Sequence, residues 1–221
     1  MINTNSVSLV EASSQYLSIT DAAQTGLDIT GDITIEHWVK FTTLPADAHE
    51  VQFISKMDLP SQRSYSTFLN NSTGNKWFYF ALSPDGTEAS EQLNRVGWVP
   101  STGVWYHIAV TFEAATGYNK FYVDGVQQGA TQSVAPSGIF NSNADFRIGR
   151  KYSVYFDGLI DEVRIWNVVR TVTEINNNKA VMINAASGLV GSWHFGGLTG
   201  PFPTFLPGAG NLSDSSGNNN T

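Results

Sequence analysis

ITIEHWVKF, residues 33–41, alternates between two sets of side chains along its whole length. Ile33, Ile35, His37, Val39 and Phe41 fall on one face of an extended chain, and the residues between them fall on the other. Such period-two alternation predicts a half-buried β-strand. We therefore expect one face of this strand to pack against a second layer of the protein.

Similar short runs recur along most of the chain, separated by clusters of Gly, Pro, Asn and Asp. Asp124-Gly125 predicts a type I′ hairpin, because both central positions of that turn need positive φ. A single helix is expected at residues 172–180, with Thr171 or Thr173 as its N-cap and Glu174 in its first turn. Strands are expected at residues 9–19, 51–56, 65–69, 76–82, 105–112, 119–123, 126–128, 146–149, 158–166 and 189–195.

This pattern predicts an all-β fold: a two-sheet antiparallel β-sandwich of the jelly-roll kind with one short helix. Long helices do not alternate with the strands, which disfavours a parallel α/β sheet. No linker divides the chain before about residue 196, so we expect a single domain over residues 1–221 with a loop-rich tail at 196–221.

The composition narrows the range of partners. The chain has 221 residues and a formal net charge of −7, with only 12 Lys and Arg residues and no cluster of them. A nucleic-acid-binding protein needs a basic face, so nucleic acid is excluded as the expected partner. Cysteine is absent, which excludes disulfides and thiolate chemistry. No apolar run reaches the ~20 residues of a membrane span, so membrane insertion is not expected.

Residues 1–5 have neither the basic nor the apolar region of a signal peptide. We expect this chain to have been cut from a longer protein, with further domains among its partners.

Several segments, taken in order, resemble the laminin G-like domains of the concanavalin A-like lectin/glucanase superfamily. The matching segments span residues 9–195 and imply a concanavalin A-like jelly roll. They include SQYLSI (14–19), ITIEHWVK (33–40), ISK (54–56), WYHIAVTF (105–112), FYVDG (121–125), IGR (148–150), FDGLIDEVRIWN (156–167) and TEI (173–175).

The resemblance also implies a structural calcium ion, for which Asp161 is the corresponding ligand. The family's second acid is missing, because the matching segment reads Trp193-His194-Phe195 followed by two glycines. Asp214, Asp21 or Asp157 are the candidates to replace it, since Ca²⁺ prefers carboxylate and carbonyl oxygens. The alternative is that Asp161 accepts hydrogen bonds from Arg164 or from nearby backbone amides.

Catalytic signatures are missing from the sequence. The E-x-D-x-E strand of the related glucanases does not occur, and Asp161 and Glu162 would point to opposite faces of a strand. His107 has no nucleophile context, and the four histidines have no paired spacing for zinc. We therefore expect a protein that is not an enzyme; a glycan hydrolase or lyase remains a less favoured alternative.

Sugars pack their apolar faces on aromatic rings while amide and charged side chains bind their hydroxyls. Trp77 and Tyr79 share one face of the strand at 76–82, and Asn70, Asn71 and Asn75 flank them. Trp38, Trp105 and Trp166 are assigned to the core. The candidate ligand-binding residues are Trp77, Tyr79, Trp98, Asn71, Tyr152 and Tyr155.

These observations favour a non-catalytic, extracellular or cell-surface binding module, lectin-like and recognising a glycan or serving adhesion. The alternative is a protein-interaction or spacer domain of a large surface protein. The expected partner is therefore a glycan or a surface protein.

Overall fold

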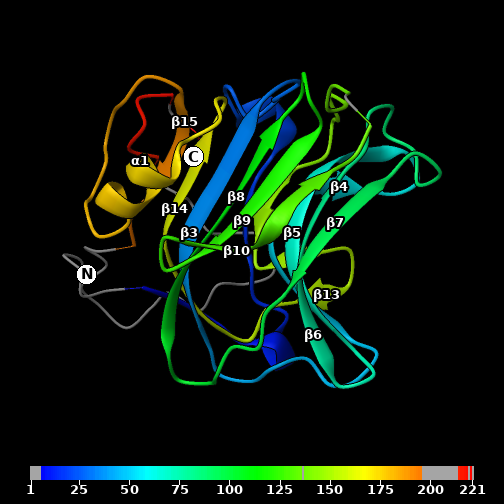
Figure 1. Ribbon diagram of the computed structural model, residues 1–221, viewed down its shortest axis with the longest axis vertical. Helices are drawn as coiled ribbons and strands as arrows, with labels where there is room; N and C mark the ends of the chain where they lie inside the picture. Colours follow the sequence, from blue (N-terminus) through cyan, green and yellow to red (C-terminus); the bar gives the residue numbers. More distant parts are fainter. Residues whose placement is uncertain (1–5, 136, 196–213, 219, 221) are drawn as a thin grey trace.

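The computed structural model describes residues 6–135, 137–195, 214–218 and 220. Two antiparallel sheets stack face to face, and one short helix lies beside them in the described part of the chain (Figure 1). The predicted all-β sandwich is therefore confirmed.

The seven-stranded sheet has the order β1-β14-β3-β8-β9-β10, and β15 pairs with the far end of β14. β1 pairs with the first residues of β14, and β15 pairs with its last residues. A bulge separates these two parts, because the pairing of β14 with β3 shifts register between Asp161 and Arg164. Its strands are β1 (Val7–Leu9), β3 (Ile33–Phe41), β8 (Trp105–Glu113), β9 (Tyr118–Val123), β10 (Val126–Ser133), β14 (Gly158–Trp166) and β15 (Leu189–Trp193).

The six-stranded sheet has the order β2-β11-β4-β5-β6-β7. A small hairpin, β12 (Arg150–Lys151) and β13 (Val154–Tyr155), lies against β4 of this sheet. In Figure 1, β4 to β7 and β13 occupy the right-hand side of the molecule. The strands are β2 (Leu17–Ile19), β4 (Glu50–Asp58), β5 (Gln62–Ser72), β6 (Asn75–Leu82), β7 (Gln92–Gly97) and β11 (Phe146–Ile148).

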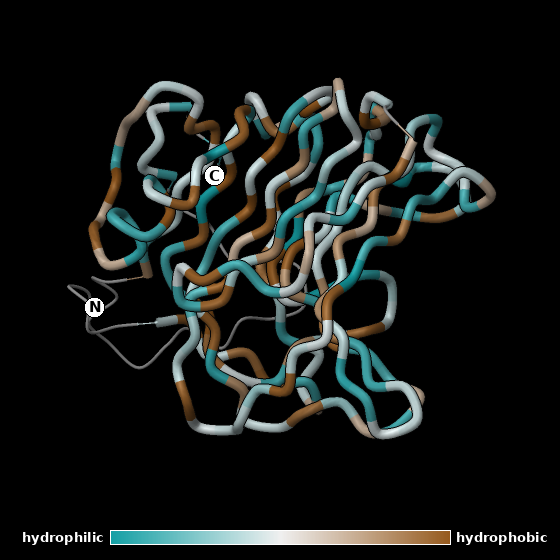
Figure 2. The backbone as a smooth tube through the Cα atoms, viewed as in Figure 1, coloured by the Kyte–Doolittle hydropathy of each residue, from teal (hydrophilic) through white to brown (hydrophobic). Residues whose placement is uncertain are grey.

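The core lies between the two sheets and is rich in aromatic rings. His37 faces inward on β3, as the alternation predicts, and its ring lies 5.4 Å from that of Phe53 on the opposite sheet. Figure 2 shows the alternation of hydrophobic and hydrophilic residues along strands of both sheets. Burial of apolar area between the sheets is the main stabilising contribution. Rings that pack here include Phe41, Phe53, Phe78, Phe121 and Phe156.

The Asp124-Gly125 turn is confirmed, with φ values of 52° and 83° between β9 and β10. The single strand expected at residues 9–19 is wrong. This segment contains only the last residue of β1 and all of β2; the two strands join different sheets and are separated by a 3₁₀ turn, Glu11–Ser13, and by Ser14 at positive φ. β7 has no counterpart among the expected strands.

The outer face of the seven-stranded sheet is covered by the segment that follows β14. This segment contains α1 (Val172–Asn178), shorter than the predicted helix, and Thr171 forms a reciprocal capping box with Glu174 at its start. Ile175 packs on Ala109 and Tyr122 of the sheet. Figure 1 shows α1 beside β14 and β15.

Trp38 and Trp105 are half-buried on the same outer face, and their assignment to the core is wrong because alternation turns them away from it. Trp166 is buried, but it lies under the covering segment and donates to Glu36.

The expected strand at residues 189–195 is seen as β15, and Asp214 pairs with Trp193 in an isolated bridge. Of the tail predicted at 196–221, residues 196–213, 219 and 221 lie outside the described residues. In the described ranges, no helix has the length and apolar character needed to cross a membrane.

Candidate functional site

The outer face of the six-stranded sheet carries the side chains that point away from the core. Phe78, Phe80, Tyr65 and Leu69 point into the core, so their neighbours on β5 and β6 point outward. The strand register places these outward residues in rows across the sheet. One row reads Glu50, Asn70, Trp77 and Gly97; the next reads Gln52, Phe68, Tyr79 and Arg95; the third reads Ser55, Ser66, Ala81 and Leu93.

The middle row is a stack of rings and cations. The Phe68 and Tyr79 rings are parallel, with an interplanar angle of 3° and centroids 4.7 Å apart. Lys151 Nζ, from the β12–β13 hairpin, lies 4.6 Å from the centroid of the Phe68 ring. It also lies 3.7 Å from Glu50 Oε1, so its charge is partly balanced. This stack fixes the orientation of both rings.

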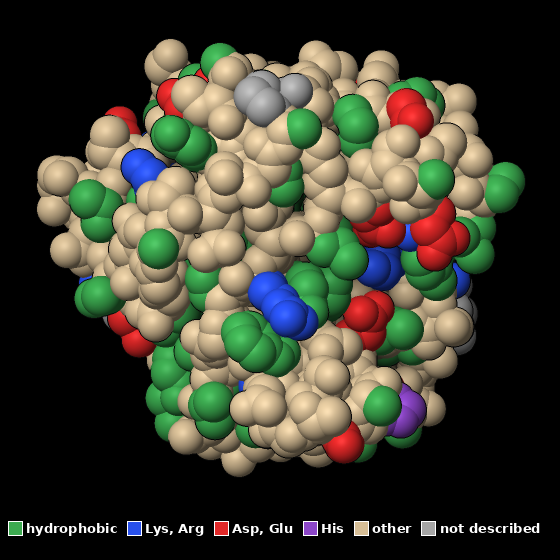
Figure 3. Space-filling model, turned by 45° about the vertical axis from the view of Figure 1, so that its right-hand side comes forward, with side chains coloured by type: hydrophobic (Ala, Val, Ile, Leu, Met, Phe, Trp, Pro, Cys, Tyr) green, Lys and Arg blue, Asp and Glu red, His purple; other side chains and the backbone are tan. Residues whose placement is uncertain are grey.

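Arg95 closes the other end of this stack. Its guanidinium carbon lies 4.4 Å from the centroid of the Trp77 ring and 5.6 Å from that of Tyr79. Its Nη1 donates to the Tyr79 hydroxyl at 2.6 Å. Figure 3 brings this side of the molecule forward and shows hydrophobic side chains next to Lys, Arg, Asp and Glu side chains. The predicted pair Trp77 and Tyr79 is therefore brought together, but the guanidinium covers the Trp77 ring, so the pair is not an open platform.

Buried hydroxyls line the sheet next to these rings. Ser55, Ser64 and Ser66 are wholly buried, and their Oγ atoms have no hydrogen-bond partner among the described residues. A buried hydroxyl without a partner costs about 1–3 kcal/mol. Because these hydroxyls are closed to solvent, an enclosed ordered water is the partner that would satisfy them.

Tyr152 lies at the tip of the β12–β13 hairpin above this region. Its ring lies 5.7 Å from the Arg63 guanidinium, and its hydroxyl is buried without a partner among the described residues. Burial raises the pKa of Tyr152 to about 12, so the phenol stays protonated and able to donate near neutral pH. The predicted residue Tyr152 thus joins Trp77 and Tyr79 on one face.

The other three predicted ligand-binding residues lie elsewhere. Trp98 is 8% exposed and packs in the core against Phe41 and Phe78, because it continues the inward side of β7. Asn71 is buried and donates to the Pro45 carbonyl, so it fastens a loop. Tyr155 packs near Tyr16 and under Arg150, at the side where the hairpin meets the first residues of the domain.

Sequence reasoning missed Phe68, Arg95 and Lys151, which complete the stack. Leu93 and Arg95 alternate with Asn94 and Val96 before Gly97, which is the signal of a short strand. That signal could have placed Arg95 outward on β7. Lys151 had no such signal, because the hairpin reaches the sheet only through tertiary packing.

Of the four predicted calcium ligands, Asp21 forms an ion pair with a lysine. The buried Lys56 Nζ lies 2.7 Å from Asp21 Oδ1 and 3.0 Å from Asp28 Oδ1. It also donates to the carbonyls of Ser142 and Ala144 at 2.9 and 2.8 Å. An ammonium group therefore holds the position among oxygens that a metal ion would need.

The remaining predicted ligands are also engaged with the protein. Asp161 Oδ1 accepts from the backbone of Glu162 at 2.8 Å, which is the hydrogen-bonded alternative given above for this residue. Asp157 accepts from Thr43, and Asp214 accepts from Ser192, from Ser216 and from Asn220. Within the described ranges, no three His, Asp or Glu side chains converge on a common point. The described residues thus do not fit a calcium site built from these four acids.

Acidic and histidine side chains also contact each other on the seven-stranded sheet, but there they are buried. Glu36 Oε2 lies 3.4 Å from His107 Nε2, with both side chains at most 1% exposed. Burial opposes the charge of Glu36, but the hydrogen bond and charge of His107 hold its pKa below the usual value. Arg164 lies 2.8 Å from Glu162 and donates to the carbonyls of Asn178 and Val181. This network fastens the α1 segment to the sheet and offers a substrate no access.

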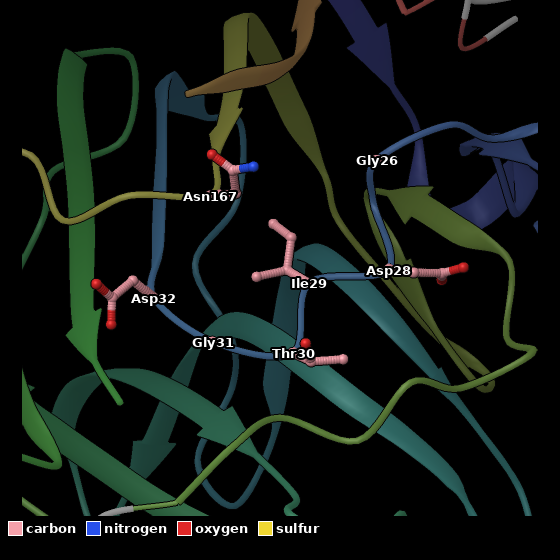
Figure 4. Close-up of a pocket in the computed structure, with 7 residues that line it drawn as sticks. All are labelled: Gly26, Asp28, Ile29, Thr30, Gly31, Asp32 and Asn167. Carbon is pink, nitrogen blue, oxygen red and sulfur yellow. The ribbon is translucent and has the colours of Figure 1, made fainter. Parts of the chain in front are cut away.

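Two of the hollows that described residues line lie beside the sheets. One, of about 330 Å³, is lined by residues 26 and 28–32 with Asn167. Figure 4 shows the carboxylates of Asp28 and Asp32 pointing to opposite sides, so they cannot share a cation. The other, of about 310 Å³, lies beside the β3–β4 loop and is lined in part by Glu50, which also begins the first row of the outer face.

Solved structures share this fold. The chain aligns with a putative carbohydrate-binding protein from Bacteroides ovatus at a TM-score of 0.68 and 21% identity, covering 92% of this chain and 54% of that one. The chain thus spans about half the length of that protein. At these identities the likeness concerns the fold.

Two further structures are similar. One is domain 4 of AbnA, a GH43 extracellular arabinanase from Geobacillus stearothermophilus, in complex with arabinotriose (TM-score 0.58, 23% identity, 78% of this chain and 75% of that one). The other is the CBM40 of the Ruminococcus gnavus IT-sialidase bound to α2,3-sialyllactose (TM-score 0.60, 12% identity, 79% and 96%).

Comparison with curated proteins found no match. The family model of the laminin G type matches residues 11–176, well over half of the chain, and contains the strands of both sheets from β2 to β14. The chain therefore belongs to the concanavalin A-like lectin/glucanases superfamily, as a laminin G-like domain.

Proposed function

We propose that this protein is a non-catalytic, extracellular glycan-binding module whose ligand lies on the outer face of the six-stranded sheet. One observation carries the proposal: the half-buried rings of Trp77 and Tyr79 lie together on the outer face, beside the exposed guanidinium of Arg95 and its N–H donors. A sugar presents both an apolar face and many hydroxyls, so it matches this combination.

The residues of this face would supply two kinds of contact to the ligand. Trp77 and Tyr79 are half-buried, so the part of each side chain that Arg95 leaves accessible supplies apolar contact area, while the exposed N–H donors of Arg95 supply hydrogen bonds. The ring stack holds these groups in place before the ligand arrives, which lowers the entropic cost of binding. Of the similar structures named above, one is a putative carbohydrate-binding protein and the other two hold arabinotriose and α2,3-sialyllactose, which supports this choice of ligand.

The test is binding to a glycan array, repeated with Trp77→Ala and with Trp105→Ala. Trp105 is a matched control: it is also half-buried with a cation over its ring, Lys40 Nζ at 5.5 Å, but it lies on the opposite sheet. Trp77→Ala should weaken binding by about tenfold or more, as loss of one aromatic contact of 1–3 kcal/mol implies, and Trp105→Ala should not.

An array without any bound glycan would refute the proposal. A partner protein captured with an affinity that Trp77→Ala does not change would favour the alternative of a protein-interaction domain. Release of shortened products from the bound glycans would show that the module is catalytic.

A further inference from the structure

Arg95 is the basic side chain on the outer face whose charge is not balanced. Arg63 faces Glu88 and Glu91, and Lys151 faces Glu50. Arg95 is exposed, and no described carboxylate lies within ion-pair distance of it. Its described partners are the Trp77 ring, the Tyr79 ring and the Tyr79 hydroxyl, all of them neutral.

The neighbours of Arg95 also fix its position. The guanidinium lies over the Trp77 ring, and its Nη1 donates to the Tyr79 hydroxyl at 2.6 Å. A guanidinium has five N–H donors in a rigid fork, so holding one edge leaves the other able to bind a carboxylate through two parallel hydrogen bonds. Such an orientation would otherwise have to be selected at the moment of binding.

The same guanidinium covers the Trp77 ring, on which a neutral sugar would stack. A ligand that reaches this end of the face therefore meets a cation before it meets an aromatic surface. A neutral sugar would have to displace it, whereas a sugar that carries an acidic group would bind it.

We propose that the outer face of the six-stranded sheet selects a carboxylate-bearing sugar, whose acidic group pairs with Arg95. This inference rests on the proposed function and names the ligand class of the same site.

Calorimetry with two matched pairs of probes tests the inference: tetragalacturonate against its carboxyl-reduced form, and sialyllactose against lactose. In at least one pair, the acidic member should bind about tenfold or more tightly, as expected for a charge-assisted hydrogen-bond pair. Arg95→Gln should lower the affinity for the acidic member to that of the neutral one, and Arg95→Lys should keep part of the preference because it keeps the charge.

Lys40→Gln is the matched control, since Lys40 lies over Trp105 on the opposite sheet. It should leave both affinities unchanged, and thermal melts should show that every variant is folded. Equal binding of acidic and neutral members by the unaltered protein would overturn the inference. So would a rise in neutral-sugar affinity in Arg95→Gln, which would show that the guanidinium merely covers Trp77.

Different experimental results would refute the proposed function and the role of Arg95. Neutral sugars that bind in a Trp77-dependent manner, without any preference for acid, would leave the glycan module standing and remove the role of Arg95. Absence of binding by the probes and by the array would remove both.

Discussion

The ammonium of Lys56 and the carboxylate of Asp21 form an ion pair at 2.7 Å that joins the middle of the six-stranded sheet to the loop after β2. The lysine side chain is wholly buried, while that of Asp21 is 29% exposed. Asp28 and two carbonyl oxygens complete the set of acceptors around the ammonium. The lysine thus ties together three segments that are distant in the sequence.

Replacing Lys56 with Met should destabilise the protein by about 3–5 kcal/mol, because it leaves two carboxylates and two carbonyls facing an apolar side chain. Urea denaturation of both proteins gives the difference in the free energy of unfolding. Lys40→Met is the control, since Lys40 is half-buried without a carboxylate partner among the described residues, and it should cost less than about 1 kcal/mol. Equal effects of the two substitutions would contradict the role of Lys56.

Trp98→Ala should destabilise the protein by about 3–5 kcal/mol, the usual cost of removing a large ring from a packed core. Trp98 contacts Phe41, Phe78 and Tyr106 between the sheets. At a temperature where the variant is folded, its glycan affinity should match that of the unaltered protein. A variant with normal stability and lost binding would instead place Trp98 in the site.

His37 makes stability depend on pH. Burial lowers the pKa of His37 to about 3 in the folded protein, against 6.5 for an accessible histidine. The unfolded chain therefore takes up a proton between these two values that the folded protein refuses, so stability falls as the pH falls through this window. The loss reaches at most about 5 kcal/mol, from 1.36 kcal/mol for each unit of pKa.

His37→Leu should flatten the dependence between pH 6.5 and pH 3 that comes from this residue. Urea denaturation at several pH values measures the effect, and the buried neighbours Glu36 and His107 remain as a common background in both proteins. A variant whose stability falls as steeply as that of the unaltered protein would show that His37 is protonated in the fold.

Calcium should not raise the melting temperature through the four predicted acids, because protein donors already engage each of them. An ion that binds only the native state must raise the melting temperature. Melts in millimolar calcium and in chelator compare the two conditions directly. A calcium-dependent rise that disappears in Asp161→Asn would restore Asp161 as a ligand and contradict this prediction.

Replacing Arg164 with Met should cost about 3–5 kcal/mol, because it leaves the buried carboxylates of Glu36 and Glu162 without their shared cation. It also removes the donors to the carbonyl of the last residue of α1, Asn178, and to that of Val181. Protease cleavage within residues 167–188 should then increase. Unchanged cleavage would show that the α1 segment is held by apolar contacts such as those of Ile175.

The alternation within single strands was enough to determine the fold class. Residues 33–41 carry their own period of two, and Asp124-Gly125 carries its own turn preference, so neither depends on distant residues. The same local reasoning placed Trp77 and Tyr79 on one face and predicted a helix whose N-cap is Thr171 or Thr173, of which the structure has Thr171.

Tertiary structure alone decided which face meets the outside and what lies on it. Residues 98 and 77 are both tryptophans near turns. Trp98 follows β7 on the side that faces the core and is buried, whereas Trp77 lies on the outward-facing side of β6 and stays at the surface. Arg95, Phe68 and Lys151 come from three separate segments and meet only because strand register and the β12–β13 hairpin bring them together. Register is set by pairing between strands, so a local pattern cannot contain it.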